Sequence, residues 1–332
     1  MSVGIIGTGS YLPSKVLTNF DLEKIVDTSD EWIKTRTGIS ERRIIDDNAN
    51  ISDMAVEASK KALLDADLEV SDIDLIILAT CSPETLMPST SCLVQQKLGA
   101  KTIPAFDVSA GCTGLIYAIT IGTQFIETGM YEKVLVIGAD ALSRHLDWTD
   151  RTTCVLFGDG AGAVILGKVQ KGYGIISNYL AADGKGADLL KIPAGGSGLP
   201  ATEDSFEKKL HCVQMSGSEV FKFATRALPR ATKAALKRAN LTIDDVKYII
   251  PHQANIRILE NVAKKFGVGF DKLIKNIDKY GNTSTASIAI ALDELQRANK
   301  IHEGDILLLV GFGAGLTWGA NVIKWVKYKK SK

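Results

Sequence analysis

Cys112 has the residue type and the setting of a nucleophile. It lies in the segment DVSAGCTGLIYA (107–118), where an apolar run gives way to small residues and then to a helical pattern. At the start of a helix, unpaired N–H groups and the helix dipole favour a thiolate over a thiol. The alternative is that Cys112 is a small buried hydrophobic residue, the usual place of a free cysteine. The other four cysteines lack a predicted helix start and are interpreted as structural: Cys81, Cys92, Cys154 and Cys212.

Two polar residues in the second half of the chain have settings that suit the same chemistry. His252 directly follows the apolar run 248–250, and crevices in open α/β sheets lie beyond the carboxyl ends of strands. Asn282 lies in the segment GNTS (281–284), just before a second helical pattern. Each has a plainer interpretation, because a lone histidine can be structural and asparagine often caps a helix. Their matching places relative to Cys112 favour one combined site with a Cys, a His and an Asn.

Glycine-rich segments suggest one anion site and exclude two nucleotide-binding motifs. The segment GFGAGL (311–316) follows an apolar run. Its backbone N–H groups are candidates for stabilising an oxyanion, with a plain tight turn as the alternative. The segment GTGSYL (7–12) has Leu12 where a dinucleotide fingerprint needs a third glycine. The segment GDGAG (158–162) precedes a predicted strand instead of a helix, and no G-x-x-x-x-G-K-[ST] sequence occurs.

The elements that must position these residues occur twice along the chain. Four landmarks recur in the same order at offsets of 170 to 173 residues: 3–6 with 173–176, 73–77 with 246–250, 106–107 with 277–278, and 136–138 with 309–311. A fixed offset of this kind indicates an internal repeat. Each half begins with a strand, continues through helices with apolar residues three and four apart, and ends with a strongly apolar strand.

The repeat predicts the fold class. Alternating strands and helices indicate an α/β fold with parallel pairing and helices on the sheet faces. Two such halves predict a layered α/β/α/β/α sandwich with a pseudo-two-fold axis. We expect the N-terminal half, which carries the cysteine, at 1–170 and the C-terminal half, which carries the histidine and asparagine, at 171–332. The Gly- and Pro-rich segment 181–214 interrupts the second half, and an active-site cover and a disordered loop are the two interpretations.

The bulk properties argue against several classes of protein. The 332 residues carry a formal net charge of +1, without the clustered basic excess of a nucleic-acid-binding protein. No apolar run approaches the roughly 20 residues of a membrane span, and the N-terminus lacks the positive region of a signal peptide. The five cysteines include no C-x-x-C pair, which argues against a zinc site or a disulfide framework. We therefore expect a cytoplasmic protein with reduced thiols.

Six segments together resemble the β-ketoacyl-acyl carrier protein synthase III family, the initiating condensing enzymes of type II fatty acid synthesis. They are DTSDEWIKTRTGI (27–39), SAGCTG (109–114), FGDGAG (157–162), PHQAN (251–255), GNTS (281–284) and GFGAGLTWG (311–319). The similarity runs nearly from end to end, and the combination of PHQAN with GNTS is quite specific to this branch. The resemblance implies a thiolase-like fold and a homodimer.

The resemblance also implies roles for individual residues. Cys112, His252 and Asn282 match the catalytic triad, and the backbone N–H groups of Cys112 and Ala314 match the oxyanion hole. Arg257 matches a position associated with carrier-protein docking. Met87 matches a residue donated across the dimer to the acyl pocket of the partner subunit.

The coenzyme A site of the family also maps onto this sequence. It corresponds to Thr28, Trp32, Arg36, Thr37, Arg151, Phe221, Ala254 and Asn255. Trp32 and Arg36 are one helical turn apart, so both can face one ligand. A stacked adenine suits Trp32, and phosphate groups suit Arg36 and Arg151.

The implied reaction is a decarboxylative condensation in two half-reactions. Acetyl-CoA or a short branched acyl-CoA first acylates Cys112. Malonyl-acyl carrier protein then loses CO₂, and its carbanion attacks the acyl-enzyme to give a β-ketoacyl-acyl carrier protein, with no metal and no redox cofactor. The alternatives are a condensing enzyme of a secondary-metabolite pathway, an acyltransferase that does not condense, and an inactive scaffold that binds acyl carrier protein.

Overall fold

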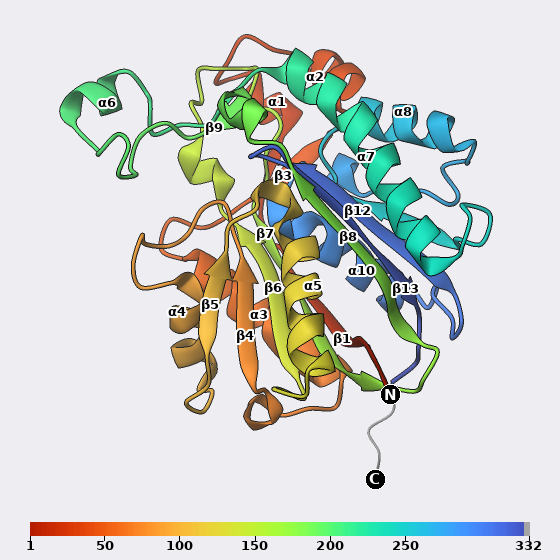
Figure 1. Cartoon of the computed structure of the whole chain (residues 1–332). Helices are drawn as coiled ribbons and strands as arrows, with labels where there is room; N and C mark the ends of the chain where they lie inside the picture. The colour runs from red at the N-terminus through yellow and green to blue at the C-terminus, as the bar shows by residue number, and fades with distance from the viewer. Residues whose placement is uncertain (329–332) are drawn as a thin grey trace.

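Two mixed β-sheets form the centre of the computed structural model, which describes residues 1–328 (Figure 1). In spatial order, the first sheet contains β1 (Ser2–Tyr11), β7 (Gly160–Val169), β6 (Val134–Asp140), β4 (Leu75–Ala79) and β5 (Ala105–Val108). The second contains β11 (Tyr248–Pro251), β12 (Ile306–Gly313), β13 (Thr317–Lys324) and β8 (Gly174–Ala182).

Helices lie outside each sheet and between the two sheets. α3 and α4 cover the outer face of the first sheet, α7 and α8 cover the outer face of the second, and α5 and α10 fill the space between them. The bounds are α3 (Ile51–Asp65), α4 (Thr90–Leu98), α5 (Gly114–Glu127), α7 (Gly217–Ala239), α8 (Ile256–Phe266) and α10 (Ser287–Arg297). This order of layers is the α/β/α/β/α sandwich that the sequence predicts.

Strand β4 shows why the central strands are apolar at every position. Leu75 and Ile77 pack in the cluster between the sheets, whereas Ile76 and Leu78 pack in the cluster beneath α3. Successive side chains of a strand point to opposite faces. A strand covered on both faces therefore needs apolar residues throughout, and all of β4 is buried.

The strand pairing differs from the parallel arrangement expected from the sequence. β4 pairs in parallel with β5 and β6, and β11 with β12. β7 is instead antiparallel to β1 and β6, and β13 is antiparallel to β12 and β8. Only residues 314–316 separate β12 from β13, which is too short for the crossover that parallel neighbours require.

The repeat is also less regular than the sequence predicts. Residues 106–107 lie in β5, but their expected counterparts at 277–278 lie in the helix α9 (Ile277–Tyr280). In place of a strand, Leu273 forms a single parallel bridge with Ile249. The strands of the first sheet end by Val169 and those of the second begin at Gly174. The division into halves at 1–170 and 171–332 stays a prediction.

Shorter elements connect the strands and helices of the layers. They are β2 (Lys15–Thr18), β3 (Glu41–Ile44), α1 (Asn19–Leu22), α2 (Asp30–Thr37), η1 (Val70–Asp72), η2 (Gly111–Thr113), η3 (Leu142–His145), η4 (Gly184–Leu189), β9 (Leu190–Lys191), α6 (Glu203–Glu207), β10 (Gln214–Met215) and η5 (Ser284–Ala286). The small helix α6 projects from the body of the molecule at the upper left of Figure 1. Over residues 1–328, none of the helices has the length and apolar character needed to cross a membrane.

Candidate active site

The predicted nucleophile lies where the chain passes from a strand into a central helix. β5 ends at Val108, and Cys112 is the middle residue of the 3-10 turn η2, which leads directly into α5. The Cys112 residue is 7% exposed, and two cavities reach it. The cysteine therefore has the helix-start setting that the sequence indicates.

The loop after β12 lies directly against the backbone of Cys112. A Cβ atom added to Gly313 would lie 2.3 Å from the Cys112 nitrogen, and one added to Gly111 would lie 2.4 Å from the Ala314 nitrogen. Gly111 also has a φ of +58°, a conformation that other residues rarely adopt. Glycine is therefore needed on both sides of this contact. The contact brings together the backbones of the two residues predicted to form an oxyanion hole.

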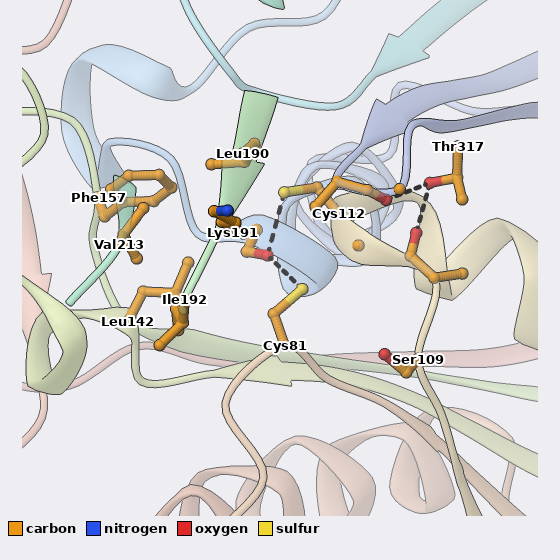
Figure 2. Close-up of a pocket in the computed structure, with 15 residues that line it drawn as sticks. Cys81, Ser109, Cys112, Leu142, Phe157, Leu190, Lys191, Ile192, Val213 and Thr317 are labelled. Carbon is orange, nitrogen blue, oxygen red and sulfur yellow. Dashed lines mark hydrogen bonds between the residues drawn. The ribbon is translucent and has the colours of Figure 1, made fainter. Parts of the chain in front are cut away.

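Ser284 and Cys81 lie beside the sulfur of Cys112. The Ser284 Oγ is 3.3 Å from the Cys112 Sγ and 3.5 Å from the Cys81 Sγ. In Figure 2 the sulfurs of Cys81 and Cys112 lie on either side of this hydroxyl oxygen, and a dashed line joins each of them to it. A hydrogen bond with Cys81, assisted by His252 and Ser284, lowers the pKa of Cys112 well below its ordinary value, although burial acts in the opposite direction.

The same hydrogen bond has the opposite effect on Cys81. The bond to Cys112, followed by burial, raises the pKa of Cys81. The two shifts together favour the proton on Cys81 and the thiolate on Cys112. The interpretation of Cys81 as a merely structural cysteine is wrong, because the loop after β4 carries it to the reactive sulfur.

His252 is held at the end of β11 by three contacts. Its backbone N–H donates to the Val310 carbonyl at 2.8 Å, and its Nδ1 lies 2.7 Å from the Ser287 Oγ. Its ring meets the Phe312 ring edge-on, with the centroids 5.6 Å apart. Because Nδ1 is occupied by Ser287, Nε2 is the ring nitrogen left for a substrate.

Asn282 is fixed through its backbone and through one side of its amide. Its N–H donates to the Leu156 carbonyl at 2.9 Å, and its carbonyl accepts from the Gly158 N–H at 3.1 Å. The side-chain Oδ1 accepts from the Ser284 N–H at 2.9 Å, so the Nδ2 group is the part of the amide left to donate. Ser284 has a φ of +49°, a strained conformation for a residue other than glycine and one that is frequent at functional sites.

Asp140 anchors both loops that approach the Cys112 sulfur. This buried carboxylate closes β6. Its Oδ1 accepts from the Cys81 N–H at 2.7 Å and the Ser82 hydroxyl at 2.8 Å, and its Oδ2 accepts from the Thr285 hydroxyl at 2.8 Å. Burial raises the pKa of Asp140 against the opposing effect of hydrogen bonds. No motif in the sequence points to Asp140, and its one signal is an ionisable side chain at the end of an apolar strand.

A cavity of about 680 Å³ contains the three predicted triad residues and most of the predicted coenzyme A site. Cys112, His252 and Asn282 all line it, as does Arg257. Seven of the eight residues predicted to bind coenzyme A also line it: Trp32, Arg36, Thr37, Arg151, Phe221, Ala254 and Asn255. Residues from both halves of the chain thus converge on one space.

Cationic and aromatic groups meet along this cavity. The Arg151 guanidinium lies 5.2 Å from the centre of the Trp32 ring, a distance at which cation–π attraction operates. The Asn255 Nδ2 donates to the Arg36 carbonyl at 3.1 Å. That bond ties α2, which carries Trp32 and Arg36, to the start of α8.

Two predicted residues lie outside the cavities that reach Cys112. Thr28 lines neither of them, and its buried Oγ1 has no hydrogen-bond partner among residues 1–328. Met87 also lines neither and is 83% exposed. The structure of one chain therefore does not bring these two residues to the site.

A second cavity of about 360 Å³ also reaches Cys112 and is mostly apolar (Figure 2). Its lining includes Cys81, Leu142, Phe157, Leu190, Ile192 and Val213. The last three come from the long segment that interrupts the second half. This placement favours the interpretation of 181–214 as a cover over the site.

Two stretches of the chain match family descriptions. Residues 106–184 match 3-oxoacyl-[acyl-carrier-protein (ACP)] synthase III, and residues 236–325 match the C-terminal part of the same synthase. The beta-ketoacyl-[acyl-carrier-protein] synthase III of Caldanaerobacter subterraneus subsp. tengcongensis is 58% identical over 327 residues, which are 98% of this chain and 99% of that protein. The protein of that name from Clostridioides difficile is 54% identical, over 97% of this chain and 98% of its own length.

A solved structure agrees with these matches. The crystal structure of 3-oxoacyl-[acyl-carrier-protein] synthase III from Aquifex aeolicus VF5 superposes with a TM-score of 0.90 at 48% identity, covering 98% of this chain and 100% of that chain. The fold is therefore thiolase-like, as the family resemblance implies. The chain belongs to the 3-oxoacyl-[acyl-carrier-protein] synthase III family.

Proposed function

We propose that Cys112, His252 and Asn282 carry out the two half-reactions of this family in this chain. The protein is an acyltransferase that condenses an acyl-CoA with malonyl-acyl carrier protein and so initiates fatty acid synthesis. One observation carries the assignment of residues. A cysteine whose surroundings favour the thiolate lies where two cavities meet, and a buried histidine and asparagine line one of them.

In the first half-reaction, the Cys112 thiolate attacks the carbonyl carbon of the acyl-CoA thioester. A tetrahedral oxyanion forms, and the backbone N–H groups of Cys112 and Ala314 stabilise it. Coenzyme A leaves as its thiolate and the acyl group remains on the sulfur. The close approach of Gly313 to the Cys112 nitrogen supports this pair of donors.

In the second half-reaction, His252 and Asn282 stabilise the enolate formed when the malonyl group loses CO₂. Asn282 presents its Nδ2 group, because its Oδ1 is held by the Ser284 N–H. His252 presents Nε2, because its Nδ1 is occupied by Ser287. Donors fixed before the reaction stabilise developing charge most effectively. The carbanion then attacks the acyl carbonyl on Cys112 and displaces the thiolate.

The larger cavity is the binding site that we propose for coenzyme A and for the arm of the carrier protein. Trp32 offers an aromatic face, and Arg36 and Arg151 offer positive charge for phosphate groups. Arg257, which lines the same cavity, is our candidate for the contact with the carrier protein. The smaller apolar cavity receives the acyl chain of the primer, for which acetyl and short branched groups are our candidates.

We further propose that the protein acts as a homodimer in the cytoplasm. Leu86 and Met87 are adjacent apolar side chains that are 81% and 83% exposed in the single chain. Side chains of this kind are commonly covered by a partner, and Met87 is our candidate for the residue that reaches the acyl pocket of the other subunit. The five free cysteines suit a reducing compartment.

Mass spectrometry of the protein tests the proposed function. The protein is mixed with acetyl-CoA, and malonyl-acyl carrier protein is added afterwards. We expect an acetyl adduct on Cys112 that disappears as acetoacetyl-carrier protein forms. An adduct only with longer or branched acyl-CoAs would change the primer and keep the mechanism. The absence of an adduct with every acyl-CoA would overturn the role of Cys112.

A further inference from the structure

Two hydrogen-bonding groups meet at the hydroxyl of Ser287. The Ser287 Oγ lies 2.7 Å from the His252 Nδ1, and the Gln253 backbone N–H donates to the same oxygen at 3.4 Å. Ser287 and His252 are each 1% exposed. These bonds therefore lie inside the protein, where a donor without an acceptor is costly.

The arrangement of protons follows from what each group can do. A backbone N–H can only donate, so the Ser287 oxygen accepts from Gln253. The Ser287 hydroxyl proton then needs an acceptor, and within residues 1–328 the His252 Nδ1 is the one found at hydrogen-bond distance. A neutral imidazole has one donor nitrogen and one acceptor nitrogen. If Nδ1 accepts from Ser287, the ring proton is on Nε2.

We propose that Ser287 is a positioning residue that fixes the tautomer of His252 with the Nε2–H facing the larger cavity. The inference rests on the proposed function, because it supplies the N–H donor that the enolate oxygen requires there. Histidines at functional sites are commonly oriented through the bond made by their second ring nitrogen. Here that bond comes from a serine at the first position of α10.

Hydrogen bonds of its own side chain hold Gln253, the residue whose N–H donates to Ser287. The Gln253 Nε2 donates to the Pro251 carbonyl at 2.8 Å and to the Ile274 carbonyl at 3.1 Å, and its Oε1 accepts from the Asn276 N–H at 3.1 Å. These three bonds hold the Gln253 side chain in one position and so restrict the residue that donates to Ser287. The Gln253 N–H therefore orients the Ser287 hydroxyl, whose proton is left to point at the His252 Nδ1.

The test begins with the tautomer of His252 in the unmodified protein. The full chain is labelled with ¹⁵N-histidine and studied by NMR at about pH 8, where histidine is ordinarily neutral. The chain has four histidines, and the spectrum of His252→Ala identifies the signal of interest. We expect a protonated Nε2 and an unprotonated Nδ1. A protonated Nδ1 would overturn the proposal, whatever the activity of the enzyme.

The Ser287→Ala variant tests the consequence for the reaction. With Nδ1 left without its donor, the Nδ1–H tautomer should gain population, and CO₂ release from malonyl-acyl carrier protein should fall by about 10-fold or more. Acetylation of Cys112 by acetyl-CoA should stay within about twofold of the unmodified protein, because His252 serves the second half-reaction. An unchanged tautomer together with unchanged CO₂ release would overturn the role of Ser287.

Ser59→Ala is the matched control. Ser59 is buried in α3, and its hydroxyl donates to the Ala55 carbonyl at 2.6 Å, so the variant also loses a buried serine bond. We expect it to leave the tautomer and CO₂ release unchanged. If the unmodified protein released no CO₂ from malonyl-acyl carrier protein, the proposed function would fail, while the NMR result would still decide the tautomer.

Discussion

The turns around Cys112 and Thr285 share one backbone design and have different chemical surroundings. Each is a 3-10 turn that leads into a helix of the central layer, and the second begins 173 residues after the first. Each turn begins with a residue of positive φ, which is +58° at Gly111 and +49° at Ser284. The middle residue is Cys112 in the first turn and Thr285 in the second.

The partners of the two middle residues explain the difference. The Cys112 sulfur faces two cavities. Its neighbours Ser284 and Cys81 form only weak hydrogen bonds with it, because sulfur is a poor hydrogen-bonding atom. The Thr285 hydroxyl lies 2.8 Å from the Asp140 carboxylate and 3.0 Å from the Ala79 carbonyl. One turn thus leaves its central side chain free to react. The other uses the equivalent side chain to hold the loop that positions Asn282 and Ser284.

The largest effect is expected from Cys112→Ala. The variant should lose the acetyl adduct completely, because it removes the atom that forms the new bond. Stability should change little, since the lost sulfur borders a cavity. Mass spectrometry after addition of acetyl-CoA and urea unfolding measure the two effects. Cys92→Ala is the control and should keep the adduct; an adduct on another residue of Cys112→Ala would contradict the assignment.

Asn282→Ala should separate the two half-reactions. We expect CO₂ release from malonyl-acyl carrier protein to fall by roughly 100- to 1000-fold, which is the usual effect of losing one donor to a developing oxyanion. Acetylation of Cys112 should remain within a few-fold in Asn282→Ala, because Asn282 is not among the groups that lower the pKa of Cys112. His252→Ala should lose CO₂ release as strongly, but it should also slow acetylation, because His252 helps to lower that pKa. Stopped-flow acetylation and CO₂ measurement give the two rates. A parallel loss of both rates would show that the two roles are not divided.

Thr285→Val tests the structural side of the comparison. Valine keeps the shape of threonine and removes the hydroxyl that bonds Asp140. A buried carboxylate that loses such a partner costs about 1–3 kcal/mol in the free energy of unfolding, whereas Cys112→Ala should cost much less. Urea unfolding of the two variants measures the contrast. Equal stability of both variants would mean that the second turn is not anchored through Thr285.

The sequence could predict the parts of this molecule that depend on local pattern. The buried strand at 75–79 and the helix that follows Cys112 each have a periodicity or composition of their own. The glycine-rich segment at 311–316 was located correctly, although its first three residues continue β12 and only 314–316 form the turn. The partners of Cys112 were not predictable in this way. Cys81 lies 31 residues before Cys112 in the sequence, and Ser284 lies 172 residues after it. A short sequence pattern carries no information about contacts between residues so far apart.

Pairing direction was mispredicted for a related reason. Alternating strands and helices indicate parallel neighbours, but β13 returns beside β12 after a three-residue connection and β7 lies between β1 and β6. The direction of a strand depends on its connection and its neighbours, and the apolar run itself carries no sign of it. The role of Asp140 was not predicted, because it consists of hydrogen bonds to two loops that are distant in the sequence.

The smallest effect is expected from Cys81→Ala, and it concerns pH. The hydrogen bond from Cys81 lowers the pKa of Cys112, so its removal should raise that pKa. Less thiolate would then be present near pH 6, and alkylation of Cys112 by iodoacetamide should slow there by about tenfold. At high pH the two proteins should react alike, because both are then fully ionised.

Cys81→Ser is the matched variant for this measurement. Serine keeps an O–H donor at the same place, so its rate profile should stay close to that of the unmodified protein. Mass spectrometry follows labelling of Cys112 separately from the other cysteines between about pH 5 and 9. If Cys81→Ala kept the original profile, the thiolate would depend on Ser284 and His252 instead. The reactivity of Cys112 in the first turn would then depend only on residues from the second half of the chain. One of them, Ser284, begins the second turn.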